Sequence, residues 1–414
     1  MLVTDTSSRS ADGAGRIRVL LVALIFFATA LNYVDRQVLA LLKPTLELEF
    51  GWTDQEFAHL GSTFQFAAAL ALLGVGWFVD RFGVRFAYAF AVVIWSMAGM
   101  AHALAASVQQ FVSARIVLAA AEAVNTPAAM KAAAVYIPLR ERSIAIGAIN
   151  TAPNIGAIVT PLLIPPFAVA FGWQAAFIVT GALGFVWLAL WIPAMRKLEP
   201  VSKAPERAPV NWGKLLNDRR TWAVAGAKFL TDCVWWFVLF WMPDFFSRVY
   251  GMDQGELGWP VAMIFTLAAI GAISSGALYP ILLSRGFSIN GARKLSMLVF
   301  ALAVLIMPLA LVTESPWLAA MFIGLGLFAH QGFSTNIFGM TTDIVPAIRV
   351  GSVIAVGAIA GNISGTAMIE FAGWSLTHGL GYAPMFIICG GAYLAALGLI
   401  HLILPRLELA EEEG

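Results

Sequence analysis

Long apolar runs, separated by short polar stretches, follow one another along the whole of this 414-residue chain. Each run has about 20 residues or more, enough for a helix to cross a hydrocarbon core of roughly 30 Å. The runs are continuous, unlike the alternating ten-residue segments of a membrane β-barrel. The predicted spans are residues 17–41, 59–79, 86–106, 109–136, 144–166, 174–195, 221–247, 257–283, 293–313, 316–343, 351–375 and 381–404. The pattern therefore predicts an all-α integral membrane protein with twelve transmembrane helices.

The composition agrees with a chain that lies mostly within a bilayer. Hydrophobic residues make up 60% of the sequence and charged residues 12%, whereas soluble proteins carry about 25% charged residues. The sequence contains no P-loop, no HExxH motif and no Cys/His cluster, and Cys233 and Cys389 both fall inside predicted spans. These observations disfavour an enzyme and an ATP-driven pump. We expect no metal site, no organic cofactor and no nucleic-acid partner.

The spans divide into two sets of six around the longest polar stretch, residues 196–220. A short internal echo between residues 142–149 and 351–359 links the fifth span to the eleventh, as duplication of a six-helix unit predicts. The predicted organisation is a cytoplasmic N-terminus (1–16), a six-helix bundle (17–195), a cytoplasmic linker (196–220), a second six-helix bundle (221–404) and a cytoplasmic C-terminus (405–414).

The positions of the basic residues predict the orientation. If both termini are cytoplasmic, 19 of the 25 Lys and Arg residues lie in or beside cytoplasmic segments, and only Lys43 and Arg248 fall in outer loops. The other four are Arg36, Arg115, Lys131 and Lys228. Basic residues concentrate on the cytoplasmic side of membrane proteins. We therefore expect a multi-pass protein of the inner (plasma) membrane with both termini inside.

Seven of the charged side chains that fall inside the predicted spans stand out as candidates for function. A charge at the centre of a bilayer helix costs about 2.5–3.5 kcal/mol on insertion scales, so such a residue is a functional candidate by default. The seven are Asp35, Arg36, Arg115, Glu122, Lys131, Lys228 and Asp232.

The loop after the second span carries a recognisable motif. Residues 76–85 read GWFVDRFGVR, which matches G-x3-D-R-x-G-x-R and resembles the loop signature of the major facilitator superfamily. The resemblance implies a gating role, without substrate contact, for Gly76, Asp80, Arg81, Gly83 and Arg85. We expect Asp80 to cap a helix or to pair with basic residues across the interface of the two bundles. The equivalent loop of the second half, residues 276–294, has Tyr279 and Pro280 near the position of the acid and is degenerate.

Further motifs narrow the resemblance. The run of residues 32–36 (NYVDR), together with Arg115 and Glu122, resembles the anion:cation symporter family, and residues 121–123, 131–132, 141–145, 172–174 and 329–331 resemble the bacterial hexuronate transporters. The resemblance implies a major facilitator fold of two six-helix bundles. It also implies proton carriers at Asp35 and Glu122, a coupling arginine at Arg115, and substrate contacts at Arg36, Lys131 and Lys228.

Helical geometry gives an independent reading of the charges. Arg115 and Glu122 are seven residues apart and share one helix face, as a proton site or as a purely structural ion pair. Asp35 and Arg36 point about 100° apart and can serve different partners. Arg36 suits a carboxylate through its planar guanidinium, unless both side chains extend to the membrane interface. Tyr33 suits a sugar hydroxyl or an interfacial position equally.

Lys228 and Asp232 are one helical turn apart, so they form either a self-neutralising pair or part of a binding site. A carboxylate held between Arg36 and Lys228 would lie midway between the two halves, where alternating access requires its site. Trp235 or Trp236 of the same span could stack on a sugar ring.

The last candidates are less specific. Lys131 either extends to the cytoplasmic interface or contacts substrate. Neutral polar residues in the spans either bridge helices or bind ligand; they are Asn150, Asn154, His330, Gln331 and Asn362.

Together these features predict one-to-one symport of a proton and a hexuronate by a monomeric protein embedded in the lipid bilayer, with protons as the coupling ion. The seven candidate charged residues, four basic and three acidic, leave a net charge of +1, which one substrate carboxylate would balance. The alternatives are symport of another organic anion, such as galactonate, glucarate or tartrate, and proton-coupled export.

Overall fold

The computed structural model describes residues 6–201 and 212–408, and within these ranges all regular secondary structure is helical. The α-helices are α1 (Thr6–Leu41), α2 (Lys43–Phe50), α3 (Asp54–Ala101), α4 (Val108–Glu122), α5 (Asn125–Tyr136), α6 (Leu139–Phe171), α7 (Trp173–Lys197), α8 (Trp212–Asn217), α9 (Arg219–Tyr250), α10 (Gly258–Ser274), α11 (Leu278–Ser284), α12 (Ile289–Val304), α13 (Pro316–Ile344), α14 (Ala347–Thr377) and α15 (Ala383–Ile403). Short 3-10 helices are η1 (His102–Leu104), η2 (Ser275–Ala277) and η3 (Met307–Leu311).

The described residues contain ten helical stretches that are long and apolar enough to cross a membrane. One of them, α3, holds two predicted spans, because the chain turns at Gly83 with φ +75°, a backbone conformation that glycine adopts without strain. The pair α4 and α5 supplies the remaining span. These stretches confirm the predicted fold class of twelve membrane helices.

Several predicted spans differ in detail. The span 109–136 is broken after Glu122, and α5 begins at Asn125, because Pro127 has no N–H for the carbonyl of Ala123. The span 257–283 is interrupted by the 3-10 turn η2, α1 begins at Thr6 rather than at residue 17, and α2 occupies the predicted first outer loop. Of the predicted linker, residues 202–211 lie outside the described residues, as do residues 1–5 and 409–414.

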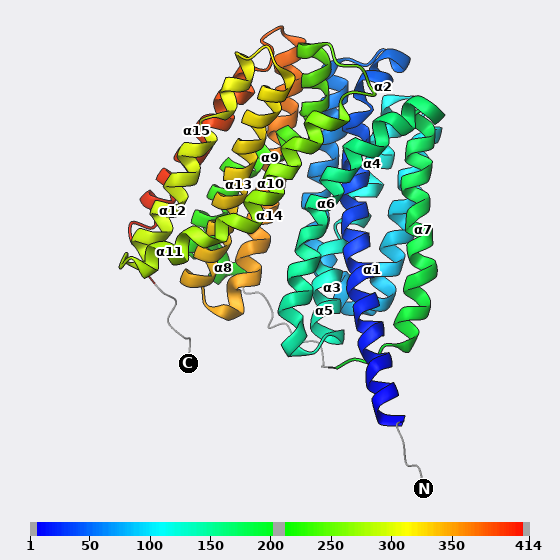
Figure 1. The fold of residues 1–414 in the computed structure, drawn as a ribbon, viewed down its shortest axis with the longest axis vertical. Helices are drawn as coiled ribbons and strands as arrows, with labels where there is room; N and C mark the ends of the chain where they lie inside the picture. The colour runs from blue at the N-terminus through cyan, green and yellow to red at the C-terminus, as the bar shows by residue number, and fades with distance from the viewer. Residues whose placement is uncertain (1–5, 202–211, 409–414) are drawn as a thin grey trace.

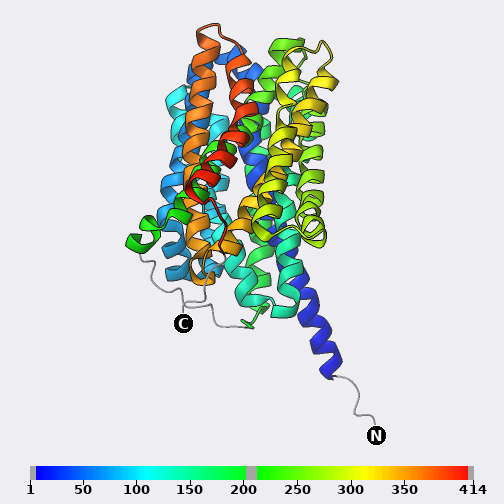
Figure 2. The ribbon, with the colours of Figure 1, turned by 90° about the vertical axis from the view of Figure 1, so that its left-hand side faces the viewer.

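The helices form two groups, α1–α7 and α9–α15, which meet mainly where α3 packs on α14, α6 on α10 and α1 on α9, with a smaller contact of α2 on α9 (Figure 1). The start of α1 and the end of α15 lie at one end of the molecule, here called the terminal end (Figures 1 and 2). We call the opposite end the α2 end. In Figure 1 the two groups lie together at the α2 end and diverge toward the terminal end.

Candidate functional site

An ion pair between Arg36 and Glu122 lies at the centre of the charged cluster. Arg36 Nε lies 3.0 Å from Glu122 Oε2, which joins α1 to the last residue of α4, at the break before α5. The side chain of Glu122 is fully buried, and its Oε1 has no hydrogen-bond partner in the part of the chain that the structure describes. The interfacial position considered for Arg36 is therefore not observed. The partner of Glu122 is Arg36 rather than Arg115.

Aromatic rings from both halves surround the Arg36 guanidinium. Its Cζ lies 5.3 Å from the ring centroids of Tyr33 and Phe64 and 5.7 Å from that of Trp236. Trp236 belongs to α9, in the second half. Arg36 thus lies at the interface between the two halves, beside Tyr33 and Trp236, both of which the sequence predicts as substrate contacts.

Asp35 and Arg115 are buried beside this pair, each with unsatisfied polar atoms. Both carboxyl oxygens of Asp35, and Nε and Nη1 of Arg115, have no hydrogen-bond partner among the described residues. The Arg115 Cζ lies 4.5 Å from the centroid of the Phe64 ring, and the two side chains interact electrostatically with each other and with Glu122. Uncompensated buried charge is costly, which weighs against a purely structural pair.

In the second half, Lys228 and Asp232 form an ion pair within α9. Lys228 Nζ lies 2.8 Å from Asp232 Oδ1, and the two side chains are only 13% and 15% exposed. The Lys228 ammonium also lies 5.2 Å from the centroid of the Phe338 ring on α13. Trp236, one turn further along α9, has its ring centroid 5.7 Å from Arg36 Cζ. The pair therefore borders the same region as Arg36.

A ladder of three glycines on α14 makes room for the α9 side chains. A Cβ atom on Gly357 would lie 3.3 Å from Lys228 Cγ, and one on Gly361 would lie 2.9 Å from Asp232 Cγ. A Cβ on Gly365 would overlap the Trp236 ring in the same way. The glycine ladder, Gly357, Gly361 and Gly365, allows α14 to approach the charged face of α9 closely.

The other predicted ligands are more scattered. Trp235 stacks on His330 with ring centroids 5.6 Å apart, and His330 Nδ1 is hydrogen-bonded to the Tyr393 hydroxyl at 2.6 Å. The remaining amides occupy varied positions: Asn150 is exposed on α6, Asn154 and Gln331 are half-buried, and Asn362 donates to the carbonyl of Ala358 on its own helix.

Lys131 lies apart from the Arg36 cluster. Its Nζ donates to Asp80 Oδ1 at 2.6 Å and to the carbonyl of Val79 at 3.1 Å, so it belongs to the loop signature. The structure thus contradicts the alternative in which Lys131 joins Arg36 and Lys228, because Asp80, exposed beside the bend of α3, holds its ammonium. The described contact of Asp80 is made within one half.

The rest of the loop signature also packs within the first half. Arg85 Nε donates to the Tyr136 hydroxyl at 3.1 Å and its Nη2 to the carbonyl of Leu198. Gly76 is half-exposed on α3 and Arg81 is exposed beside the bend at Gly83.

The degenerate loop of the second half uses a different pairing. Arg293 stacks on the Tyr279 ring, 3.4 Å from its centroid, and donates to Asp343 at 3.1 and 2.8 Å. In place of the loop acid, the second half therefore has an aromatic ring under an arginine.

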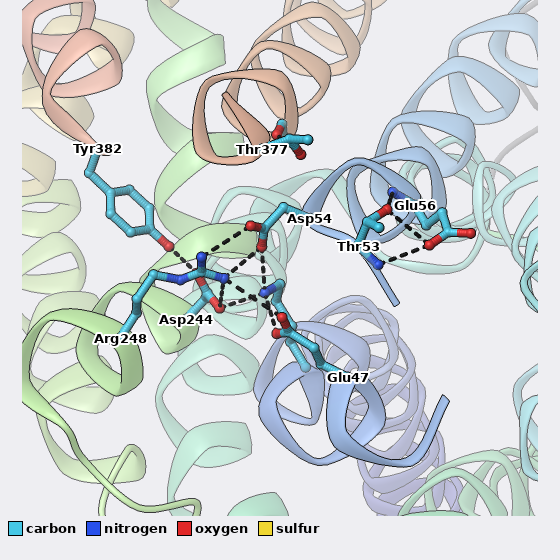
Figure 3. A network of polar contacts seen from close by, with 10 residues as sticks. Glu47, Thr53, Asp54, Glu56, Asp244, Arg248, Thr377 and Tyr382 are labelled. Carbon is cyan, nitrogen blue, oxygen red and sulfur yellow. Dashed lines mark hydrogen bonds and ion pairs between the residues drawn. The ribbon is translucent and has the colours of Figure 1, made fainter. Parts of the chain in front are cut away.

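At the α2 end an ion cluster joins the two halves (Figure 3). Lys43 is 1% exposed, and its Nζ lies 2.8 Å from Glu47, 2.9 Å from Asp54 and 2.6 Å from Asp244 of α9. Arg248 of α9 in turn lies 2.7 Å from Asp54. Each half therefore places a basic residue on an acid of the other half.

Tyr382 completes the α2-end ion cluster, because its hydroxyl group donates a hydrogen bond to the Asp244 carboxylate. Burial raises the pKa of Tyr382, and the adjacent Asp244 carboxylate raises it further. Burial alone would lower the pKa of Lys43, but the Asp244 and Asp54 carboxylates outweigh it, and the pKa is raised above its ordinary value of 10.5. Both groups therefore stay protonated at neutral pH. The α2-end ion cluster thus consists of Lys43, Glu47, Asp54, Asp244, Arg248 and Tyr382.

A second polar contact between the halves surrounds Glu370 of α14. Gln55 Nε2 donates to its carboxylate at 2.6 Å, His59 Nδ1 lies 2.7 Å away, and Ser62 donates a further hydrogen bond. Sequence reasoning missed this contact, although Glu370 lies inside a predicted span. The three donors recur at i, i+4 and i+7 on α3, which places them on one helix face.

The halves also touch closely at the α2 end. A Cβ atom on Gly373 of α14 would lie 2.9 Å from the Asp54 carbonyl oxygen, and one on Gly258 of α10 would lie 3.0 Å from the Pro161 carbonyl carbon. Ion pairs, hydrogen bonds and backbone contacts therefore all hold this end shut.

Comparison with known proteins places this architecture in a family. The model of the Major Facilitator Superfamily matches residues 25–369. The chain is 28% identical over 419 residues to the hexuronate transporter of Escherichia coli, with 96% of each protein covered. It is 28% identical over 417 residues to the D-galactonate transporter of the same species, covering 94% of this chain and 96% of the relative.

A solved structure shares the fold. A bacterial homologue of the human lysosomal transporter Spinster, in an inward-facing and occupied conformation, superposes with a TM-score of 0.73 at 19% identity, covering 93% of this chain and 95% of the other. The match over most of the chain, with the twelve membrane helices, settles the class of protein. The chain belongs to the Major Facilitator Superfamily and is a multi-pass membrane transporter, not an enzyme.

Proposed function

We propose that this protein is a proton-coupled symporter that takes up a sugar acid, with a hexuronate such as glucuronate or galacturonate as its substrate. It would act as a monomer in the inner (plasma) membrane with both termini in the cytoplasm, and protons would be its only coupling ion. Similarity to hexuronate and galactonate transporters over nearly the whole chain supports the substrate class.

The Arg36–Glu122 ion pair is the observation that carries the proposal. A guanidinium binds a carboxylate in a planar, charge-assisted arrangement, and here it already holds one from Glu122 at 3.0 Å. A substrate carboxylate that takes this place releases Glu122 into buried surroundings. A buried carboxylate without its cation is costly while ionised, so Glu122 takes up a proton. Substrate binding and proton binding are coupled in this way.

The charge balance of the central charged residues, those around Arg36 and Lys228, supports one proton for each substrate carboxylate. Because Lys131 pairs with Asp80, it no longer counts, and the sum of +1 expected from the sequence becomes zero. The groups that remain are three bases and three acids: Arg36, Arg115 and Lys228 with Asp35, Glu122 and Asp232. A monoanion that enters with one proton leaves this balance unchanged.

The arrangement of the halves fits alternating access. The α2-end ion cluster closes one end, and the two helix groups diverge toward the terminal end (Figure 1). With cytoplasmic termini this is an inward-facing arrangement. Rocking of the halves about the central cluster would exchange it for an outward-facing one.

Uptake of labelled glucuronate and galacturonate into vesicles, with and without a pH gradient, tests the proposal. We expect accumulation that depends on the gradient, and we expect Glu122→Gln to abolish accumulation while exchange of substrate between the two sides persists. Accumulation by Glu122→Gln would exclude this proton route. Competition by a neutral hexose as strong as by a hexuronate would exclude the anion site at Arg36, and gradient-driven efflux would indicate an exporter.

The relatives also favour a second substrate class. Besides the galactonate carrier, a probable galactarate/D-glucarate transporter of Escherichia coli is 25% identical over 446 residues. Thermal-shift titration of the purified protein with galactonate, glucarate, tartrate and the hexuronates ranks these candidates.

A further inference from the structure

The two basic residues of the proposed substrate site differ in how firmly each holds its internal acid. Arg36 is on α1 and Glu122 on α4, so a small displacement of the two helices can separate this pair. Lys228 and Asp232 are one turn apart on the same helix, with 2.8 Å between Nζ and Oδ1. Movement of one helix against another does not separate them.

The packing around Asp232 fixes it further. The glycine ladder brings the α14 backbone against it, since a Cβ on Gly361 would lie 2.9 Å from Asp232 Cγ. Among the contacts of the described residues, Lys228 is the one charged partner of Asp232, and the Asp232 side chain is 15% exposed. If a substrate carboxylate took Lys228 from it, Asp232 would remain as a nearly buried, unpaired charge, which is costly.

The alternative use of this pair is recognition of hydroxyl groups. A lysine ammonium has three N–H donors, of which Asp232 takes one from Lys228, and a carboxylate has further lone pairs that accept from O–H groups. A donor and an acceptor side by side match a sugar hydroxyl, which donates and accepts at once. Trp236, one turn after Asp232 on α9, has its ring centroid 5.7 Å from Arg36 Cζ, so the pair lies on the stretch of α9 next to Arg36.

We propose that Asp232 is a specificity-determining residue: it keeps Lys228 neutralised, so that the site accepts one carboxylate, at Arg36, and rejects sugar acids with a second carboxylate. This inference rests on the proposed function and reassigns Lys228 from a second carboxylate ligand to a hydroxyl ligand. A dicarboxylate would place its second negative charge beside Asp232, and such like-charge contacts strongly disfavour the wrong partner.

Galacturonate and galactarate test the idea, because they share a carbon skeleton and differ in having one or two carboxylates. Dissociation constants of both are measured by titration calorimetry on the purified full-length protein at neutral pH, where the free acids are ionised. We expect the wild type to bind galacturonate roughly tenfold more tightly than galactarate or better, since one like-charge contact separates them.

Asp232→Asn removes the charge and leaves the shape, so the ratio of the two dissociation constants should shift toward galactarate by roughly tenfold or more. Asp232→Glu keeps the charge and should retain the wild-type preference. In Lys228→Met/Asp232→Asn the free ammonium is gone, and the gain in galactarate binding should disappear. A thermal unfolding transition confirms that each variant is folded.

Equal binding of the two acids by the wild type would overturn the inference, even if Asp232→Asn failed to fold. So would an unchanged ratio in a folded Asp232→Asn. These outcomes leave the proposed function standing, whereas a wild type that binds neither acid, nor any other sugar acid, refutes the proposed function itself.

Discussion

Replacing Lys43 with methionine should open the α2 end of the transporter. Methionine keeps a similar length and removes the ammonium. Of the three carboxylates that Lys43 contacts, Glu47 and Asp54 belong to its own half and stay beside it when the halves separate, so only the 2.6 Å contact with Asp244 is specific to the closed arrangement. A hydrogen bond between charged groups contributes about 1.5–3 kcal/mol, so its loss shifts the equilibrium roughly 10- to 150-fold toward the open arrangement.

A double-mutant cycle isolates this contact from the rest of the α2-end ion cluster. Asp244→Asn removes the other partner, and Lys43→Met/Asp244→Asn removes both charges. Because Asp244 also contacts Arg248 and Tyr382, its single variant alone is ambiguous. We expect the double variant to open the α2 end less than the sum of the two single variants.

Spin labels on the two halves report the opening. Leu48 on α2 is 89% exposed, and Leu380, in the loop beside Tyr382, is 51% exposed. After cysteine substitution and labelling at both sites, pulsed electron resonance gives the distribution of distances between them. We expect a longer-distance population in Lys43→Met. A distribution identical to that of the parent, or strictly additive effects in the cycle, would refute the role given to the ion pair.

Three further outcomes are expected. Because the pKa of Lys43 is raised in the closed protein, the stabilisation of the closed state by Lys43 is complete below pH 10.5, the ordinary pKa of lysine, and is lost only as the pH rises through the higher pKa. The distances between the two spin labels should therefore stay constant from about pH 7 to about pH 9. A change of these distances within that range would contradict the assignment. Gly361→Ala should weaken glucuronate binding in thermal-shift titrations by roughly 1–3 kcal/mol, because its Cβ would overlap the Asp232 carboxylate. The control variant Gly391→Ala, whose Cβ would meet nothing within 4 Å, should leave binding unchanged. Equal effects of the two variants would show that the glycine ladder does not position the α9 side chains. Lys131→Met should lower the maximal uptake rate with an unchanged KM, since it removes an ion pair of the loop signature that lies away from Arg36 and Lys228. A raised KM would return Lys131 to the substrate site.

The twelve spans and the central charges could be read from the sequence because both depend on local properties. Continuous apolar length predicts a span, and charge inside a span is conspicuous whatever its partner is. For the same reason the sequence alone singles out Arg36, Glu122 and Asp232.

Partners could not be read in the same way, because they depend on how helices meet. Spacing on an unbroken helix paired Arg115 with Glu122, but the break before Pro127 leaves Glu122 at a helix end, within reach of Arg36. Likewise Lys43 was assigned to an outer loop, and only the short helix α2 and its packing against α9 place its ammonium on Asp244.

The break after Glu122 also bears on how the protein is inserted during synthesis. At 1.5 Å per residue, the 15 residues of α4 and the 12 of α5 each extend only about 18–22 Å, less than the hydrocarbon thickness, and α4 carries Arg115 as well as Glu122. Such a segment partitions poorly into lipid on its own. Arg36, the partner of Glu122, lies on α1, and the Phe64 ring, which Arg115 contacts, lies on α3. Both helices leave the ribosome before α4 does. The order of the helices along the chain thus ensures that these charges meet their counterparts when α4 enters the membrane, and moving this segment ahead of α1 should leave it stranded outside.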